Sequence, residues 1–429
     1  MIRIVTYEGQ PAAQLLDRAA EVKRDVTQAV EAIVENVRLR GDEAILDYCE
    51  AFDGARPDGL LVPEEELDAA FSQVEPEFLD TLRLAAGNIE RFHRLQKRAG
   101  FVDTPSPGVV VGQRVLPLAS AGLYVPGGTA RYPSSVLMDA IPAKIAGVQT
   151  IVMATPPGPD GRVPAPILAA AKLAGVRTVV RAGGAQAIAA LAFGTQTVPK
   201  VDKIVGPGNI YVATAKQLCY ARGLCDIDMI AGPSEIMIVS DANSNPVHLA
   251  ADLLSQAEHD RLSSAWLAVT DASLAETVAS EVERQLKLLP REEIPRTSIE
   301  QNGRILVVDS LETAARLADE IAPEHLELCV DDPFGLLPMV HNAGSVFLGR
   351  SCPEPLGDYL AGPNHTLPTS GTARYSSPLG VDDFCRRSSY LYYTPAALEK
   401  VSEDVMRFAR REGLDAHANA VAVRMEGRS

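Results

Sequence analysis

Gln256 and His259 are spaced so that a helix would bring a side-chain oxygen and an imidazole nitrogen together. They lie near the end of HLAADLLSQAEHD, whose apolar periodicity predicts a helix after Asn245-Pro246. Residues three apart project from nearly the same face of a helix, so both groups can ligate one ion. The same spacing is typical of a polar helix end that faces water, and the pair alone does not establish a metal site.

Two further segments combine carboxylates with imidazoles. Glu324 and His325 close a predicted helix, and an unperturbed histidine titrates near ~6.5, where general acid and base catalysis is efficient. The second segment is a loop rich in Gly and Pro, residues 357–368, in which Asp358 offers an oxygen ligand and His365 an imidazole. Taken singly, the Glu324-His325 dipeptide would usually be a solvated helix end.

Four of the seven histidines therefore lie in polar settings with a carboxylate or amide nearby. They are His259, His325, His365 and His417, the last of which follows Glu412 in the carboxyl-terminal tail. Zinc accepts such a mixture of nitrogen and oxygen ligands. The other three are interpreted as structural or merely exposed: His93, His248 and His341.

Glycine turns offer places for a nucleotide. Gly206-Pro-Gly208-Asn209-Ile-Tyr211 follows the strand-like KIV and only partly matches the GxGxxG fingerprint, because Tyr211 replaces the third glycine. Gly183-Gly184-Ala-Gln186 forms a second such turn. Glycine turns at helix starts present backbone N–H groups to phosphates. GxSxG, Walker and HExxH motifs are absent from the sequence, which disfavours serine hydrolases and P-loop enzymes.

Alternating strands and helices are predicted to position these groups. Up to about residue 100 the pattern is mostly helical, and short β-like runs follow from Phe101. The runs TIVMAT, TVVRAGG and KIVGPG then alternate with helical segments, and EIMIVSD, SAWLAVTD and GRILVVDS form a second series. This alternation predicts βαβ units and parallel sheets. Near the carboxyl end, Thr394 and Pro395 mark the start of a helix.

The predicted fold class is α/β, with two doubly wound, incomplete Rossmann-like lobes and small helical appendages at both ends. The expected divisions are an amino-terminal helical arm (1–22), a larger lobe carrying the zinc and catalytic residues (23–123 and 236–378), an inserted nucleotide lobe (124–235) and a helical tail (379–429). The larger lobe and the inserted lobe together suit a chain of 429 residues, which is too long for one ordinary core.

Composition restricts the partners and the location. The formal net charge is −16, and no Lys/Arg run is present that would overcome repulsion from a polyphosphate backbone, so nucleic acid is not expected as a partner. An apolar signal core and a membrane-spanning run are both absent from the sequence, and a cytoplasmic location without membrane attachment is expected. The six cysteines are scattered without a CxxC pair, so neither a disulfide framework nor a thiolate zinc site is predicted. They are interpreted as small buried hydrophobic residues.

Several segments together resemble the histidinol dehydrogenase family over essentially the whole chain. They occur in family order: IDMIAGPSEI, DLLSQAEHD, IAPEHLEL, GDYLAGPNHTLPT and DAHANAVAVR. GLYVPGG and GPGNIYVATAK match in the nucleotide lobe. The resemblance implies a four-electron oxidation of L-histidinol to L-histidine through L-histidinaldehyde, with two NAD per turnover and one zinc per subunit. It also implies a homodimer that exchanges the carboxyl-terminal tail.

The resemblance carries roles over to individual positions of this sequence. It implies Glu324 and His325 as the catalytic bases, His325 for the alcohol and Glu324 for hydration of the aldehyde. Zinc would be held by Gln256, His259, Asp358 and, from the exchanged tail, His417. These four, together with His325, also border the substrate, and further substrate contacts are implied for Ser234, His365 and Glu412. NAD contacts are implied for Tyr124, Gln186 and Asn209.

Three alternatives differ in their requirements. A dehydrogenase of the same fold acting on a sulfonated diol would not need groups that fit an imidazole, so His365, Glu412 and His417 favour histidinol. A zinc hydrolase in which Glu324 activates water would bind no nucleotide. A non-catalytic acidic scaffold would have no use for clustered polar histidines.

Overall fold

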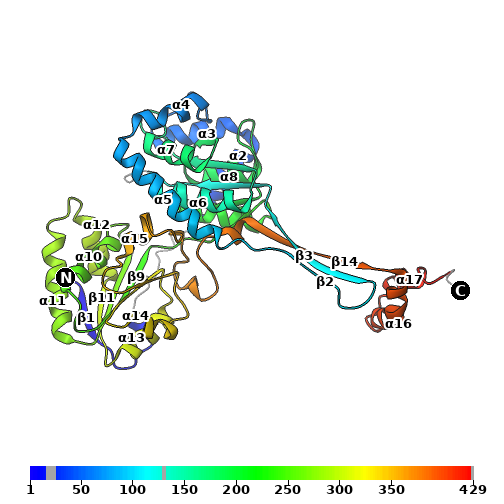
Figure 1. Ribbon diagram of the computed structural model, residues 1–429. Helices are drawn as coiled ribbons and strands as arrows, with labels where there is room; N and C mark the ends of the chain where they lie inside the picture. Colours follow the sequence, from blue (N-terminus) through cyan, green and yellow to red (C-terminus); the bar gives the residue numbers. More distant parts are fainter. Residues whose placement is uncertain (16–25, 128–131, 427–429) are drawn as a thin grey trace. The chain divides into compact units, whose positions relative to one another are not determined.

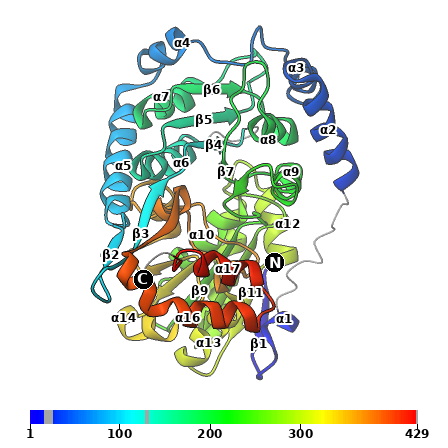
Figure 2. The same ribbon diagram turned by 90° about the vertical axis from the view of Figure 1, so that its right-hand side faces the viewer.

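The computed structural model describes residues 1–15, 26–127 and 132–426. It divides into two compact units, one of Met1–Gln96 with Leu118–Phe384 and one of Lys97–Pro117 with Cys385–Ser429. The first unit contains two parallel sheets with helices packed on them (Figures 1 and 2), and the second contains an antiparallel sheet and two helices. The predicted α/β class with two parallel sheets is therefore confirmed.

The larger sheet has six parallel strands in the order β1-β11-β10-β9-β12-β13. Its strands are β1 (Arg3–Thr6), β9 (Glu235–Ser240), β10 (Ser264–Val269), β11 (Arg304–Val307), β12 (His325–Cys329) and β13 (Ser345–Leu348). Its helices are α1 (Ala12–Leu15), α10 (Pro246–Ala257), α11 (Ala272–Leu286), α12 (Glu293–Asn302), α13 (Leu311–Ile321), α14 (Pro333–Leu336) and α15 (Glu354–Tyr359). Ile236 and Ile238 face one core and Met237 and Val239 the other, because successive strand side chains point to opposite faces.

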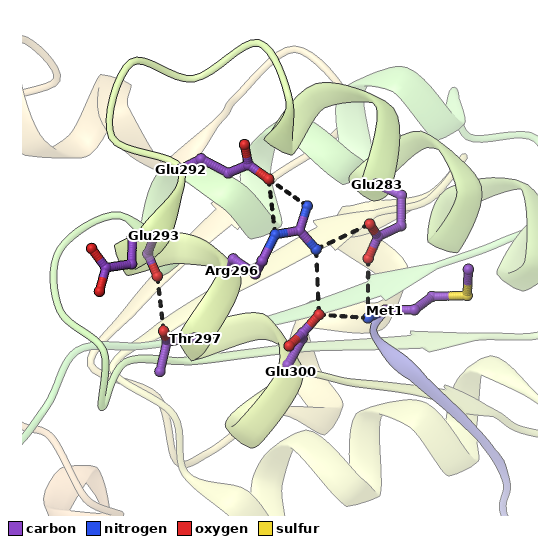
Figure 3. Close-up of polar contacts among 7 residues, drawn as sticks. All are labelled: Met1, Glu283, Glu292, Glu293, Arg296, Thr297 and Glu300. Carbon is purple, nitrogen blue, oxygen red and sulfur yellow. Dashed lines mark hydrogen bonds and ion pairs between the residues drawn. The ribbon is translucent and has the colours of Figure 1, made fainter.

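Strand β1 is held at the edge of this sheet by an ionic network (Figure 3). The Met1 amine lies 3.0 Å from Glu300 Oε1 and 3.1 Å from Glu283 Oε1. Arg296 binds both of these carboxylates and also Glu292. The network joins β1 to α11 and α12. The prediction of a helical arm over residues 1–22 is wrong for residues 3–6, because their strand is formed by pairing with the distant β11, and residues 16–25 lie outside the described residues.

The second parallel sheet has five strands in the order β6-β5-β4-β7-β8. They are β4 (Ser120–Tyr124), β5 (Thr150–Thr155), β6 (Thr178–Arg181), β7 (Lys203–Val205) and β8 (Asp226–Ile227). The connecting helices are α6 (Pro133–Ala146), α7 (Ala165–Ala174), α8 (Gly184–Phe193) and α9 (Ile210–Ala221). Because β5 and β6 lie on one side of β4 and β7 and β8 on the other, the chain reverses its strand order beside β4. A crevice for ligands is expected there, at the carboxyl ends of the strands.

The amino-terminal helices pack on this five-stranded sheet (Figure 2). They are α2 (Thr27–Arg40), α3 (Asp42–Tyr48), α4 (Glu64–Ala69) and α5 (Pro76–Arg94), with a π-helical turn η1 at Cys49–Asp53 and a 3-10 turn at Ala70–Gln73. Val30, Val34 and Ile45 share a hydrophobic core with Ile188 and Leu191 of α8. Residues 23–123 were assigned to the larger lobe. That prediction is wrong for residues 26–49, which pack on the five-stranded sheet instead. The apolar face of a helix shows that the face is covered but not which sheet covers it.

The second unit begins and ends in different parts of the chain. Its strands β2 (Phe101–Asp103), β3 (Val109–Pro117) and β14 (Cys385–Tyr393) form an antiparallel sheet in the order β14-β3-β2. Helices α16 (Pro395–Arg411) and α17 (Asp415–Ala422) follow, and Thr394 caps α16 with Pro395 at its first position, as predicted. The tail is thus not only helical, since β14 pairs along nine residues with β3.

Short 3-10 turns complete the described secondary structure, at Leu337–Met339, Thr372–Arg374 and Val381–Phe384. Among the described residues, no helix is both long enough and apolar enough to cross a membrane.

Candidate active site

The Glu324-His325 pair lies at the amino-terminal edge of the six-stranded sheet. Helix α13 ends at Ile321, and Ala322 adopts a left-handed conformation that turns the chain into β12. His325 is the first residue of β12 and is in register with Ile236 of β9 and Ser345 of β13. The sequence predicts that the pair closes a helix, whereas the structure buries Glu324 directly before β12 and His325 as the first residue of that strand.

His325 is held as a neutral imidazole with a defined tautomer. Its Nδ1 lies 3.0 Å from the carbonyl oxygen of Glu235, which can only accept, so Nδ1 carries the proton. Burial lowers the pKa of His325 to about 4, against the opposing charge of Asp358. Nε2 therefore keeps a free lone pair, and it lies 3.8 Å from Glu354 Oε1. The ring can act as a base through Nε2.

Glu324 is a buried carboxyl with one fixed oxygen. Its Oε2 accepts the backbone N–H of Glu235 at 2.9 Å and lies 3.6 Å from His325 Nδ1. Burial raises the pKa of Glu324 well above its ordinary value, although the Glu235 amide opposes the rise. A carboxylate with a raised pKa is a stronger base than an exposed one, which suits proton removal from water.

A set of metal-ligating side chains lies close to this pair. His259, Glu354 and Asp358 each offer one ligand atom, and these atoms lie within 4.8 Å of one another. Gln256, in the last turn of α10, is 1% exposed, and neither atom of its amide group has a hydrogen-bond partner in the described structure. A cation with nitrogen and oxygen ligands would satisfy these groups. The spacing of Gln256 and His259 therefore fits a metal centre.

Glu354 is a member of this cluster that the sequence interpretation missed. It is 1% exposed, and burial together with the neighbouring Asp358 raises its pKa to about 9. Its Oε2 accepts from the Ser255 hydroxyl at 3.2 Å, while Oε1 is buried without a hydrogen-bond partner among the described residues and lies 3.8 Å from His325 Nε2. Glu354 and Asp358 are four residues apart on α15, a spacing that places both on one helix face and could have revealed the residue.

The loop that carries His365 is fixed to α6. His365 Nδ1 donates to the carbonyl of Asp358 at 3.0 Å, and its Nε2 lies 3.1 Å from the Ser135 hydroxyl. Burial lowers the pKa of His365, so the ring is neutral and Nε2 accepts from Ser135. Asn364 and Thr366 bind Met138 and Asp139 of the same helix. A cavity opens here, lined among others by His325, Phe347, Asp358 and His365.

The remaining predicted substrate residues lie in two places. Ser234 directly precedes β9, next to the Glu235 backbone that binds both Glu324 and His325. Glu412 and His417 belong to the second unit, where Glu412 follows the end of α16 and His417 lies in the first turn of α17. Both are exposed. Their predicted roles at the substrate and the metal stay predictions.

The three residues predicted to contact a nucleotide follow or end strands of the five-stranded sheet. Tyr124 ends β4, Gln186 lies in the first turn of α8 after β6, and Asn209 caps α9 after β7. The Tyr124 hydroxyl accepts the N–H of Gly184 at 3.0 Å. Asn209 Oδ1 accepts from Tyr211 and Val212. These positions border the point where the strand order reverses, which is where such sheets bind ligands.

A buried ion pair fixes the Gly206 turn. Lys216 of α9 and Asp228 are each 2% exposed and bind each other. Lys216 Nζ also donates to the Gly206 carbonyl at 3.0 Å, and Asp228 Oδ2 accepts the Gly206 N–H at 2.8 Å. The backbone of the turn is thus held on both sides before any ligand arrives.

Replacing Lys216 by methionine is expected to destabilise the protein by about 3–5 kcal/mol, because Asp228 would remain as a buried charge without its partner. Urea denaturation followed by circular dichroism measures the change. Lys200→Met, at an exposed position beyond α8, is the matched control and should change the midpoint little. Equal midpoints for the two variants would contradict the structural importance of the pair.

Comparison with known proteins gives one consistent family. A family model described as histidinol dehydrogenase matches residues 16–425. The chain is 51% identical over 428 residues to the histidinol dehydrogenase of Geobacter sulfurreducens, covering 99% of each chain. It is 53% identical over 401 residues to that of Listeria monocytogenes, covering 94% of this chain and 93% of the other. A crystal structure of histidinol dehydrogenase from Elizabethkingia anophelis matches with a TM-score of 0.94 at 37% identity, covering 99% of this chain and 98% of that chain.

Proposed function

Because this chain belongs to the histidinol dehydrogenase family, we propose that it oxidises L-histidinol to L-histidine through L-histidinaldehyde. The reaction would use two NAD per turnover and one zinc ion per subunit, and would complete histidine biosynthesis. The observation that carries the proposal is the donor set of His259, Glu354 and Asp358 around the neutral base His325.

Zinc is proposed to bind Gln256, His259, Asp358 and His417 of the partner subunit. The two unpartnered polar atoms of the buried Gln256 amide and the mixed nitrogen and oxygen set support a borderline-soft cation. When bound, zinc would supply the positive charge that anchors the imidazole and amine of the substrate, and NAD would accept hydride. Glu354 lies within the same set and would offset the charge of the ion from its buried position.

Two bases divide the proton transfers in this proposal. His325 Nε2 takes the alcohol proton, since Nδ1 is committed to the Glu235 carbonyl. Glu324 then takes a proton from the water that hydrates the aldehyde, and burial raises its basicity for that task. Ser234, His365 and Glu412 bind polar groups of the substrate. The enclosed position of both bases keeps the reactive aldehyde away from side reactions.

NAD is proposed to lie along the carboxyl edge of the five-stranded sheet, in contact with Tyr124, Gln186 and Asn209. Helix α8 begins at Gly184, and its N-cap residue Gly183 provides no side-chain cap. The Gly184 N–H donates to Tyr124, so the amides that follow it are the ones proposed to bind the pyrophosphate. Asn209 already caps α9 and fixes the neighbouring turn. The strand reversal beside β4 supports a nucleotide at this edge.

The relatives support histidinol over a sulfonated diol as substrate, since the proteins that the chain resembles along its length are histidinol dehydrogenases. A zinc hydrolase would bind no nucleotide, and the glycine turns, including the Gly206 turn held by Lys216 and Asp228, would then have no ligand. A homodimer with exchanged tails is part of the proposal, because His417 and Glu412 lie in the second unit.

Removal of the metal is expected to abolish NADH formation from histidinol, by at least about 100-fold. Prolonged dialysis against a chelator, metal analysis and an assay with histidinol and NAD measure the effect, and added zinc should restore activity. His259→Ala should lose metal in the same analysis, whereas His248→Ala on an exposed turn of α10 should keep it. Full activity at negligible metal content would refute the metal assignment.

A further inference from the structure

The turn η1 brings the carboxyl group of Asp53 to the edge of the five-stranded sheet where NAD is proposed to bind. The Cys49 thiol, four residues earlier in the same turn, donates to the carbonyl of Arg181 at 3.4 Å, and Arg181 ends β6. The Asp53 carboxyl interacts with this thiol and electrostatically with Tyr124, which ends β4. Asp53 therefore approaches the sheet at the same edge as Tyr124, although it belongs to no strand.

Two hydrogen-bond acceptors at this edge have no donor. Among the described residues, Asp53 Oδ2 and Gln186 Oε1 are both buried without a hydrogen-bond partner. Gln186 Oε1 lies against Gly184, where an added Cβ would be 2.7 Å from it, and the Gly184 amide donates to Tyr124. Buried acceptors without donors are costly and rare, so their presence together indicates a ligand that supplies donors.

The residues at this edge of the five-stranded sheet indicate which part of the nucleotide supplies the two hydrogen-bond donors. A dinucleotide-binding sheet commonly places a carboxylate near the end of its second strand, where it binds ribose hydroxyls. Here the second strand, β5, ends at Thr155 and continues into Pro156-Pro157, which offers no carboxylate. A carboxylate repels phosphate, and the uncapped start of α8 suits the pyrophosphate instead. The ribose diol, with two adjacent O–H donors, matches two acceptors.

We propose that Asp53, together with Gln186, accepts hydrogen bonds from the ribose hydroxyls of NAD and thereby excludes NADP, whose 2′-phosphate would meet the carboxylate. The inference rests on the NAD site proposed above and adds to it a residue that sets cofactor specificity. The Asp53 carboxylate would favour NAD by accepting from its ribose hydroxyls and would disfavour NADP by repelling its 2′-phosphate.

The cost of the charge to the fold supports this role. Burial raises the pKa of Asp53 to about 6, so at pH 8 the carboxylate is ionised in surroundings that disfavour its charge. A carboxyl whose pKa is raised on folding lowers stability as the pH rises from about 4 through 6. If Asp53 served only the fold, removing its charge would not be expected to stabilise the protein. If Asp53 serves a ligand, removing its charge can increase the stability of the protein without the ligand.

The test is the Asp53→Asn variant, assayed at pH 8 with histidinol and either NAD or NADP. We expect the Kd for NAD, measured by calorimetry, to rise about 10-fold, and the ratio of kcat/KM for NADP over NAD to rise about 10-fold or more. The KM for histidinol should stay unchanged, and the Tm at pH 8 should not fall. Asp53→Ala provides the same readings if the amide makes new contacts. Glu50→Gln, an exposed carboxylate in the same turn, is the matched control and should leave all these values unchanged.

Unchanged NAD affinity and an unchanged cofactor ratio in Asp53→Asn would overturn this inference alone, provided that the wild-type protein binds NAD. A lower Tm with equal losses for NAD and histidinol would also overturn it, because it would mark Asp53 as structural. A wild-type protein that neither binds nor reduces NAD would overturn the proposed function itself, and the inference with it.

Discussion

The Glu324→Gln variant is expected to oxidise histidinol to the aldehyde at close to the normal rate and to oxidise the aldehyde about 100-fold to 10,000-fold more slowly. Glutamine keeps the size of the side chain and can still accept the Glu235 N–H. It cannot take a proton from water, and in the proposed reaction only hydration of the aldehyde needs that base. The His325 base for the first step stays in place, since its Nδ1 is held by a backbone carbonyl and not by Glu324.

Separate assays of the two half-reactions measure this difference, with histidinol and with histidinaldehyde as the starting substrate and NADH as the readout. Chromatography of the products should show accumulation of the aldehyde. Glu312→Gln, at the exposed start of α13, is a matched control that should leave both rates unchanged. Equal slowing of both half-reactions by Glu324→Gln would refute the division of tasks between the two bases.

A random mixture of His417→Ala and His325→Ala subunits is expected to regain about a quarter of the wild-type activity from two inactive parents. If each site takes His325 from one chain and His417 of the partner subunit, a mixed dimer contains one intact site and one doubly defective site. Random assortment makes about half of all dimers mixed, which gives the expected fraction. The physical basis is that His417 belongs to a unit distinct from the one that holds the candidate metal ligands His259, Glu354 and Asp358.

Co-expression of the two variants gives this random mixture for the assay, and different affinity tags isolate the mixed dimer, which should have about half of the wild-type activity. The control is a mixture of His325→Ala with His259→Ala, whose defects both lie in the first unit, so that no mixed dimer would contain an intact site. Recovery in that control, or no recovery with His417→Ala, would argue that each site is built within a single chain.

The sequence located much of the candidate site because local spacing determines which side chains share a helix face. The spacing of Gln256 and His259 pairs them on one helix face, and the structure buries the Gln256 amide without a hydrogen-bond partner among the described residues and places His259 in a candidate metal-binding cluster. Glu354 was missed, although it has the corresponding relation to Asp358 on α15. A lone buried glutamate resembles an exposed one in sequence, and only its burial at 1% exposure distinguishes it.

The sequence did not show which edge of each sheet carries the chemistry. In the five-stranded sheet the predicted nucleotide residues lie at the carboxyl edge, as the general rule for such sheets predicts. In the six-stranded sheet Glu324 and His325 lie at the amino edge instead. The strand reversal between β9 and β12 on the opposite edge is closed by Arg350, which binds Asp241 and Asp331. Arg350 and Asp241 are 109 positions apart, and His325 is placed by its register with Ile236 of another strand. Periodicity acts over a few residues and predicts neither contact.

The amino-acid sequence by itself determined the α/β class, the start of α16 at Thr394 and the residue types available for acid–base and metal chemistry. These follow from backbone preferences and from periodic burial, which act over a few residues. Tertiary structure alone decided that residues 26–49 pack on the five-stranded sheet, that His325 is neutral with Nδ1 protonated, and that Glu354 joins His259 and Asp358. The reason is physical: an apolar face specifies that it must be covered but not by what, and a pKa or a ligand set depends on neighbours brought together only by folding.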